Sequence, residues 1–254
     1  MTTLVGVVCE SAADQRTGCD LADRVLIESP NGIAVDRLTE LRAWIGANES
    51  PSLLLEWRHV GDLAKQKRIK VHGHFDGVPG EMDAHATRLA LRLFYSLKQP
   101  PNAVILLRDQ DGQDERMRGM QQARNDSKNP FPGAVVIGFA RRMREAWVLT
   151  GFNARAGLEK KLLRELSDGN HGLGFDPTRH SERLQSSDPA NSRSPKFVLQ
   201  KLTDGQHDRE EACWTETSLA ELSQRGVACG LTAYLDEIGQ ILLPIVVALS
   251  SSSR

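Results

Sequence analysis

Residues 103–112 read AVILLRDQDG, and this stretch decides the fold class. It opens with a short, uninterrupted apolar run, which is typical of a strand buried on both faces. The run breaks off into charged residues, and Gly112 favours a turn there. Residues 4–9 (LVGVVC) and 134–139 (AVVIGF) have the same character. We therefore expect three buried strands, each followed by a loop or turn.

Helical patterns occupy the gaps between these strands. Apolar residues recur at helical spacing in residues 12–27 and 82–97, and residues 115–123 are also expected to be helical. Strands that alternate with helices favour a parallel sheet with helices on its faces. The remaining expected elements are helices at 35–45 and 144–149 and strands at 52–57 and 68–75. We therefore predict an α/β domain over residues 1–150.

The chain changes character after Gly151. Residues 167–194 are rich in Ser, Asn, Asp and Pro, which is typical of loops. Short helical patterns flank this stretch at 158–166, 195–202, 218–225 and 232–238. We expect residues 151–254 to form a helical and loop-rich extension. The fold is thus predicted as an α/β parallel sheet flanked by helices, with a mostly helical C-terminal part.

Composition places the chain among ordinary globular proteins. It has 254 residues, 40% of them hydrophobic, and a net charge of −1, so nucleic acid would have to meet a local basic surface or a partner. Its four cysteines form no CxxC pair, which suits a reducing cytosol. The longest apolar run, residues 238–249, is interrupted by Gly239, Gln240 and Pro244 and is too short to span a bilayer. We expect a cytoplasmic protein with no membrane partner.

Carboxylates stand where two of the expected strands end. Glu10 follows the first strand, and Asp109 and Asp111 follow the second. Ligands of parallel α/β sheets bind beyond the carboxyl ends of the strands, so these side chains converge if the two strands are neighbours. Carboxylates held close together repel one another without a cation, and oxygen ligands favour Mg²⁺ or Mn²⁺. Such an ion can orient a phosphate and lower the pKa of a bound water.

Each of these carboxylates also has a plainer interpretation. Glu10 could sit at the N-terminus of the following helix, where the helix dipole favours a negative charge. Asp109 and Asp111 could belong to an ordinary turn that ends in Gly112. Asp14 lies four residues after Glu10 and could complete a second metal site or be a solvated helix charge. The matching placement of Glu10 and Asp109 favours the site interpretation.

Four short motifs carry a resemblance to a known family. Residues 10–14 read ESAAD, residues 106–112 read LLRDQDG, residues 145–149 read EAWVL, and Pro195 is followed by Lys196. An apolar strand ending in Glu, followed by one ending in Asp-x-Asp, resembles the Toprim signature. Together the motifs resemble the DUF4276 branch of Toprim-like proteins, which is related to the Toprim nuclease domains of the overcoming-lysogenization-defect type. Ser11 departs from the glycine usual in the first motif.

The resemblance implies a nuclease that depends on Mg²⁺ or Mn²⁺ and cleaves phosphodiester bonds in DNA or RNA. It also implies an effector role in bacterial defence against phage, with an ATPase as partner protein. The predicted catalytic residues are Glu10, Asp109 and Asp111. The predicted metal ligands are Glu10, Asp14, Asp109, Asp111 and Glu145. The predicted phosphate contacts are Arg108, Arg144 and Lys196. Glu145 has the alternative of a helix carboxylate paired with an arginine.

Two further clusters carry potential chemistry. His72, His74 and Asp76 form a His-x-His-x-Asp pattern that can bind a transition metal, but no later residue closes such a site, which favours a structural or exposed role. A basic run nearby could contact phosphate, although such runs are usually solvated faces. The members of this run are Lys65, Lys67, Arg68 and Lys70. The chain has no Gly-x-x-x-x-Gly-Lys loop, so it is not expected to be an ATPase itself.

Three functions are consistent with these patterns. The first is a metal-dependent nuclease, for which cleavage should be lost in Asp109→Ala. The second is a Toprim-like accessory subunit that binds a partner ATPase and does no chemistry alone, which the net charge near zero and Ser11 favour. The third is phosphotransfer or hydrolysis of a small nucleotide at the same metal site. We expect the first.

Overall fold

The structure is a computed structural model that describes residues 2–47, 54–129, 131–155 and 157–251. The chain forms two compact units. The first, here named the sheet unit, comprises Met1–Arg108, Gln113–Phe139 and Asp236–Arg254. The second, here named the helical unit, comprises Asp109–Gly112 and Ala140–Leu235. These bounds differ from the two consecutive domains expected on either side of residue 150, because the C-terminal end of the chain returns to the sheet unit.

The sheet unit is built on a five-stranded sheet. Its strands are β1 (Thr3–Cys9), β2 (Arg42–Ile45), β3 (Leu55–Glu56), β6 (Ala103–Asp109) and β7 (Ala134–Ala140). The order is β2-β1-β6-β7, and β3 also pairs with β1. β1 runs parallel to β2, β3 and β6, and Val8 in β1 lies opposite Leu55 and Leu106. This arrangement confirms the predicted α/β class and is consistent with a Toprim-like fold.

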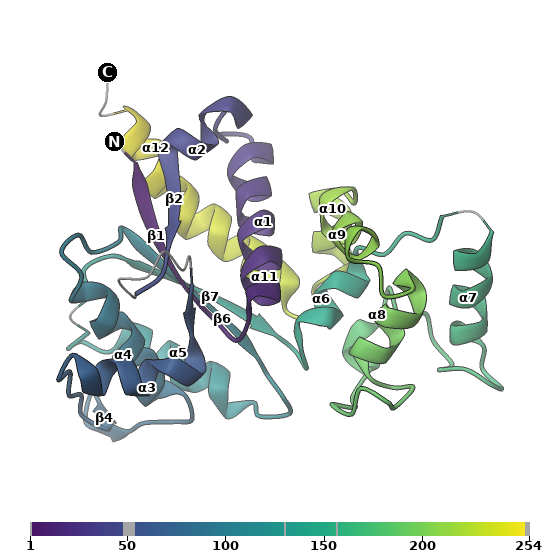
Figure 1. Cartoon of the computed structure of the whole chain (residues 1–254), viewed down its shortest axis with the longest axis horizontal. Helices are drawn as coiled ribbons and strands as arrows, with labels where there is room; N and C mark the ends of the chain where they lie inside the picture. Colours follow the sequence, from purple (N-terminus) through teal and green to yellow (C-terminus); the bar gives the residue numbers. More distant parts are fainter. Residues whose placement is uncertain (1, 48–53, 130, 156, 252–254) are drawn as a thin grey trace. The chain divides into compact units, whose positions relative to one another are not determined.

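Helices cover both faces of this sheet (Figure 1). One face meets α3 (Trp57–Gln66), α4 (Ala84–Tyr95) and α5 (Glu115–Asn125), which pack against one another in chain order. The other face meets α1 (Ala12–Glu28), a π-helical turn η3 (Ile238–Leu242) and α12 (Leu243–Ser251). Successive residues of a strand point to opposite faces, so each buried strand supplies side chains to both helical layers.

Two glycines set how closely the helices approach the strands. A Cβ on Gly6 in β1 would lie 2.6 Å from the ring of Phe94 in α4. A Cβ on Gly18 in α1 would lie 2.4 Å from Cδ1 of Leu107 in β6. Both distances are shorter than real Cβ contacts, so a larger residue at either position would require the Phe94 ring or the Leu107 side chain to shift.

The helix predicted at residues 35–45 is confirmed only up to Leu41 and is wrong over residues 42–45. This segment is instead a 3₁₀ turn (η1, Val35–Arg37), a single helical turn (α2, Leu38–Leu41) and then strand β2. Leu38 and Leu41 are buried at helical spacing, which explains the prediction. The three apolar residues that follow Arg42 lie in β2, because they pair with β1.

The strand predicted at residues 68–75 is also wrong over most of its length. Only its last two residues form a strand, β4 (His74–Phe75), which pairs antiparallel with β5 (Val78–Pro79). For the strand predicted at 52–57, β3 forms at Leu55–Glu56 and Trp57 already begins α3, while residues 52 and 53 lie outside the described residues. The remaining predicted strands and helices of the sheet unit are confirmed, with shifts of only a few residues at their ends.

The helical unit confirms a mostly helical C-terminal part. Trp147 of α6 (Arg144–Thr150) is buried in it, with its ring stacked on Tyr234 at 5.1 Å and its Nε1 donating to the Cys229 carbonyl at 2.9 Å. The predicted loop at 167–194 contains a short 3₁₀ turn, η2 (Ser181–Arg183). The helices besides α6 are α7 (Leu158–Ser167), α8 (Pro195–Thr203), α9 (His207–Thr215), α10 (Leu219–Arg225) and α11 (Leu231–Glu237), and of these α9 was not predicted.

The C-terminal apolar run is longer as a helix than the sequence indicated. Within the described residues, one helix, Leu231–Ala248, is long and apolar enough to cross a membrane by length and composition alone. Its side chains at Ile238, Leu242 and Val246 are fully buried, and the core helix of a folded domain passes the same test. The expectation that this run is too short to span a bilayer is therefore corrected, and the helix by itself is weak evidence for a membrane span.

Candidate functional site

Two neighbouring strands of the sheet unit end beside each other. β1 and β6 are parallel, and Val8↔Leu106 is the last pair of their register. Their carboxyl ends therefore share one edge of the sheet, which is where parallel α/β proteins bind ligands. Glu10 follows β1 directly, and Arg108 and Asp109 finish β6.

Four charged side chains of the sheet unit gather at this edge, and we name them the carboxyl-edge network. They are Glu10, Asp83, Arg108 and Arg116. Arg108 donates from Nη1 to Glu10 at 2.9 Å and from Nε to Asp83 at 2.7 Å. Arg116 lies 3.8 Å from Glu10 and 3.7 Å from Asp83. Two guanidinium groups thus balance two carboxylates, and Glu10 is held by arginine.

Packing holds Arg108 in place within this network. Its side chain is only 15% exposed, and its guanidinium carbon lies 5.3 Å from the centre of the Trp57 ring. Trp57 is itself fixed, because its Nε1 donates to the Leu107 carbonyl at 2.7 Å. Arg108, predicted as a phosphate contact, is therefore a largely buried residue with two carboxylate partners.

Asp14 and Ser11 cap the helix that follows β1. Ser11 is the N-cap of α1, where its Oγ accepts from the Asp14 N–H and donates to the Asp14 carboxylate at 2.7 Å. A serine side chain that accepts a backbone N–H of the first helical turn stabilises the start of a helix. Capping of α1 is thus a structural role for the serine that stands at position 11. Ser11 also gives the Asp14 carboxylate a hydrogen-bond partner at the start of α1.

The thiol beside this cap is not available as a nucleophile. Cys9 is fully buried at the end of β1. Burial, followed by the nearby charge of Asp14, raises the pKa of the Cys9 thiol to about 12. A thiol with such a pKa is protonated at neutral pH, and only the thiolate is a strong nucleophile.

The loop that holds Asp109 and Asp111 is organised within the helical unit. Oδ1 of Asp109 accepts from the backbone N–H of Arg144 at 2.9 Å, at the first residue of α6. The Gln110 N–H donates to the Ala140 carbonyl at 2.9 Å, and the Asp111 N–H donates to the Arg142 carbonyl at 3.0 Å. Asp111 and Gly112 both have positive φ, 50° and 76°, as a sharp turn requires. Asp109 is thus positioned as a cap of α6.

The other predicted site residues of the helical unit have separate surroundings. Arg144 is buried, and its guanidinium lies 2.7 Å from Glu210 and 3.4 Å from Glu145. Glu145 is also buried and is thus a helix carboxylate paired with arginine. Lys196 is exposed near the start of α8. Of these three, only Lys196 is open to a solvent-borne phosphate.

The predicted carboxylates suit Mg²⁺ or Mn²⁺ in donor type, and they are divided between the two units. Across the described residues, no group of three or more His, Cys, Asp or Glu side chains could hold a metal ion. Glu10 and Asp14 belong to the sheet unit, whereas Asp109, Asp111 and Glu145 belong to the helical unit. Glu10 also faces two arginines, whose charge opposes an incoming cation.

Comparison with known proteins adds no relative to this picture. No family model, curated protein or solved structure matches the chain.

Sequence reasoning missed half of the carboxyl-edge network. Glu10 and Arg108 were found because they stand at the ends of apolar strands, but Asp83 and Arg116 lie outside any such motif. Asp83 immediately precedes α4 with a positive φ of 65°, which aspartate tolerates better than most residues. The position of Asp83 before a helix is visible in the sequence. That position does not indicate that Asp83 pairs with Arg108, which lies 25 positions further along the chain.

Proposed function

We propose that this chain is a Toprim-like nuclease that cleaves phosphodiester bonds in DNA or RNA and depends on Mg²⁺ or Mn²⁺. One observation carries the proposal: β1 and β6 are parallel neighbours, Glu10 follows one strand, and Asp109 ends the other. Parallel α/β proteins place their ligand chemistry at that edge of the sheet. The resemblance of the sequence motifs to the DUF4276 branch supports the same function.

Phosphate is the anion that fits the carboxyl-edge network. Arg108 and Arg116 present guanidinium groups, which bind phosphate oxygens through paired N–H donors. A phosphodiester that replaced Glu10 as their partner would release the Glu10 carboxylate. On this proposal the resting network keeps Glu10 neutralised until substrate arrives, which suits an enzyme that is active only when engaged.

On the same proposal the chain acts in the cytoplasm as an effector of an anti-phage defence system. Its net charge of −1 gives it no general attraction for nucleic acid. A partner ATPase that delivers or exposes the substrate would supply what the charge of the chain does not.

Cleavage assays test this proposal. The substrates are plasmid DNA, a structured RNA and free nucleotides, each with Mg²⁺, Mn²⁺ or EDTA. We expect metal-dependent cutting of a polymer by the wild type and none by Asp109→Asn. Asparagine retains an Oδ1 that can accept the Arg144 N–H, so the start of α6 is kept while the charge is removed. Asp62→Asn, at an exposed position of α3, removes the same charge elsewhere and serves as the control.

Each alternative result has a distinct meaning. Polymer cutting that survives in Asp109→Asn would refute the assignment of Asp109. Hydrolysis of free nucleotides alone would assign the chain to the third function, chemistry on a small nucleotide.

A specific observation favours a second function, the accessory subunit without catalysis of its own. Glu10 is already paired with Arg108, whose Nη1 lies 2.9 Å from its carboxylate. This function predicts no cleavage of any substrate by the isolated chain. It also predicts a stable complex with an ATPase on co-purification from the native host.

A further inference from the structure

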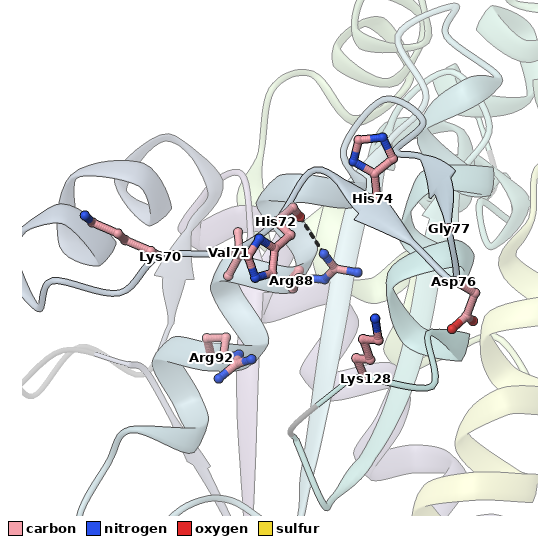
Figure 2. A pocket seen from close by; sticks show the side chains of 9 residues that line it. All are labelled: Lys70, Val71, His72, His74, Asp76, Gly77, Arg88, Arg92 and Lys128. Carbon is pink, nitrogen blue, oxygen red and sulfur yellow. Dashed lines mark hydrogen bonds between the residues drawn. The ribbon is translucent and has the colours of Figure 1, made fainter.

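A pocket in the sheet unit gathers positive charge (Figure 2). Its volume is about 430 Å³, which is in the range of small-molecule sites. It lies beside β4 and α4, and α4 contributes two arginines to its wall. The basic side chains that line it are Lys70, His72, His74, Arg88, Arg92 and Lys128. The one acidic residue in the lining is Asp76.

The Arg88 side chain is buried in the wall of this pocket and is held there by several contacts. It is only 6% exposed, although it carries a full charge. Its Nη2 lies 2.8 Å from the Asp126 carboxylate, and its Nη1 donates to the His72 carbonyl. Its guanidinium carbon lies 3.5 Å from the centre of the Phe75 ring, a cation–π contact. These contacts fix the plane of a guanidinium in the wall of the pocket.

Asp76, the acidic residue of the lining, is hydrogen-bonded to Ser127. The Asp76 carboxylate accepts from the Ser127 N–H at 3.2 Å and from the Ser127 hydroxyl. These hydrogen bonds, above all that from the hydroxyl, lower the pKa of Asp76. One carboxylate cannot balance the four permanent cations of the lining, so the pocket keeps an excess of positive charge even though Asp126 pairs with Arg88.

Two donors at this pocket lack an acceptor. The Nε atoms of Arg88 and Arg92 are buried and have no hydrogen-bond partner among the described residues. Buried donors in folded proteins are nearly always paired, and an exception calls for a missing ligand, ion or water. Lys70, Arg92 and Lys128 likewise form no salt bridge within the described part of the chain. The cations of this pocket are therefore largely uncompensated.

We propose that this pocket binds the phosphate group of a nucleotide or of a nucleic-acid backbone. A fixed guanidinium with further cationic donors around one cavity is the arrangement that recognises phosphate oxygens. The same positive charge argues against a cation at His72, His74 and Asp76, which share the lining. Figure 2 shows Lys70 extending away from Arg88, whereas Lys128 points toward the region of Arg88 and Asp76. Arg88, Arg92 and Lys128 are thus the residues that bind the phosphate.

This inference goes beyond the proposed cleavage function and does not depend on it. Binding to the pocket needs none of the carboxylates predicted as metal ligands. Phosphate binding can therefore be measured in EDTA, in which a metal-dependent nuclease is inactive. A failed cleavage assay and a failed binding assay would thus refute different statements.

Calorimetric titration of the full chain in EDTA tests the inference. The probes are inorganic phosphate, AMP and a short oligothymidylate. We expect at least one probe to bind, with an affinity that falls about tenfold in Arg92→Gln and in Lys128→Gln, because each removes a charged hydrogen-bond donor. Arg88 is left intact, because its loss would bury Asp126 without a counter-charge.

The control is Lys98→Gln, which removes one charge at an exposed position outside the pocket. Its affinity should stay within about twofold of the wild type. Binding of AMP would identify a mononucleotide phosphate, and binding of the oligonucleotide alone would identify a backbone phosphate. Absence of binding for all three probes would overturn the inference. Equal weakening in Lys98→Gln and in the pocket variants would also overturn it, because the effect would then be one of net charge.

Discussion

Arg108 is the residue on which the carboxyl-edge network depends. It donates to both carboxylates at hydrogen-bonding distance, 2.9 Å to Glu10 and 2.7 Å to Asp83. Arg116 lies nearly 1 Å further from each of them, at 3.8 and 3.7 Å. Removal of Arg108 would therefore take a close hydrogen-bond donor from each of two partly buried carboxylates.

We expect Arg108→Gln to lower the free energy of unfolding by about 1–3 kcal/mol, because two partly buried carboxylates would each lose a charged hydrogen-bond donor. Arg58→Gln is the matched control, since Arg58 pairs with Glu56 but is 73% exposed. Its effect should stay within about 0.5 kcal/mol. Urea unfolding of the three proteins measures this, and equal stabilities for both variants would show that the network contributes nothing to the fold.

At the residue scale the sequence identified positions better than partners. Glu10 and Asp109 were placed correctly at the ends of neighbouring strands, because apolar runs that stop at a carboxylate are visible in one segment of sequence. Their actual hydrogen-bond partners, Arg108 for Glu10 and the Arg144 N–H for Asp109, depend on tertiary packing. No local pattern encodes that packing.

At the scale of elements, close helix contacts depend on single glycines. Gly119 lies in the middle of α5, and a Cβ there would lie 1.8 Å from the Met82 carbonyl oxygen and 2.8 Å from the Ala84 nitrogen. Both atoms belong to the backbone at the start of α4, which cannot move away as a flexible side chain would. The packing of α5 on α4 is thus possible only with glycine at this position.

We expect Gly119→Ala to destabilise the protein by about 1–3 kcal/mol or more, through overpacking against backbone. The control is Gly61→Ala in α3, where a Cβ would have nothing within 4 Å. That change should stabilise the protein by about 0.5–1 kcal/mol, because alanine restricts the unfolded chain and favours helix. Denaturant unfolding of both variants checks the opposite signs. Two changes of the same sign would contradict the packing of α5 on α4.

Helix and strand predictions failed where pairing with a distant segment decides the structure. Residues 42–45 continue the apolar pattern of the turn before them, and they form β2 only because they pair with β1, some forty residues earlier in the chain. The buried strands β1, β6 and β7 were predicted well, since each is apolar along nearly its whole length. Local composition thus predicts strands that are apolar along their length, whereas the short strand β2 depends on tertiary contacts.

At the scale of the whole molecule, all four cysteines are buried and free. Burial raises the pKa of Cys9 and of Cys213 from the usual 9.0 to about 12, and that of Cys229 to about 11. The pKa of Cys19 is raised as well, again chiefly by burial. The folded chain therefore holds its thiols protonated at neutral pH.

We expect thiol reagents to react with the native protein only as fast as it unfolds. A pKa raised by folding contributes stability that is complete below pH 9 and is lost as the pH rises toward 11–12. The free energy of unfolding should therefore fall above pH 9, and the fall should be smaller in Cys9→Ala. Labelling kinetics and urea unfolding across this pH range check both statements. A thiol that reacted rapidly in the native protein at neutral pH would contradict the burial.

Binding of Mn²⁺, followed by the loss of its free-ion electron paramagnetic resonance signal, tests the proposed metal dependence most directly. We predict that the wild type binds Mn²⁺ and that Asp109→Asn weakens the affinity at least about tenfold, because a charged oxygen ligand becomes neutral. Asp62→Asn, which removes an exposed charge in α3, should bind as the wild type does. No binding by the wild type, or equal binding by the wild type and Asp109→Asn, would contradict a metal-dependent nuclease centred on Asp109.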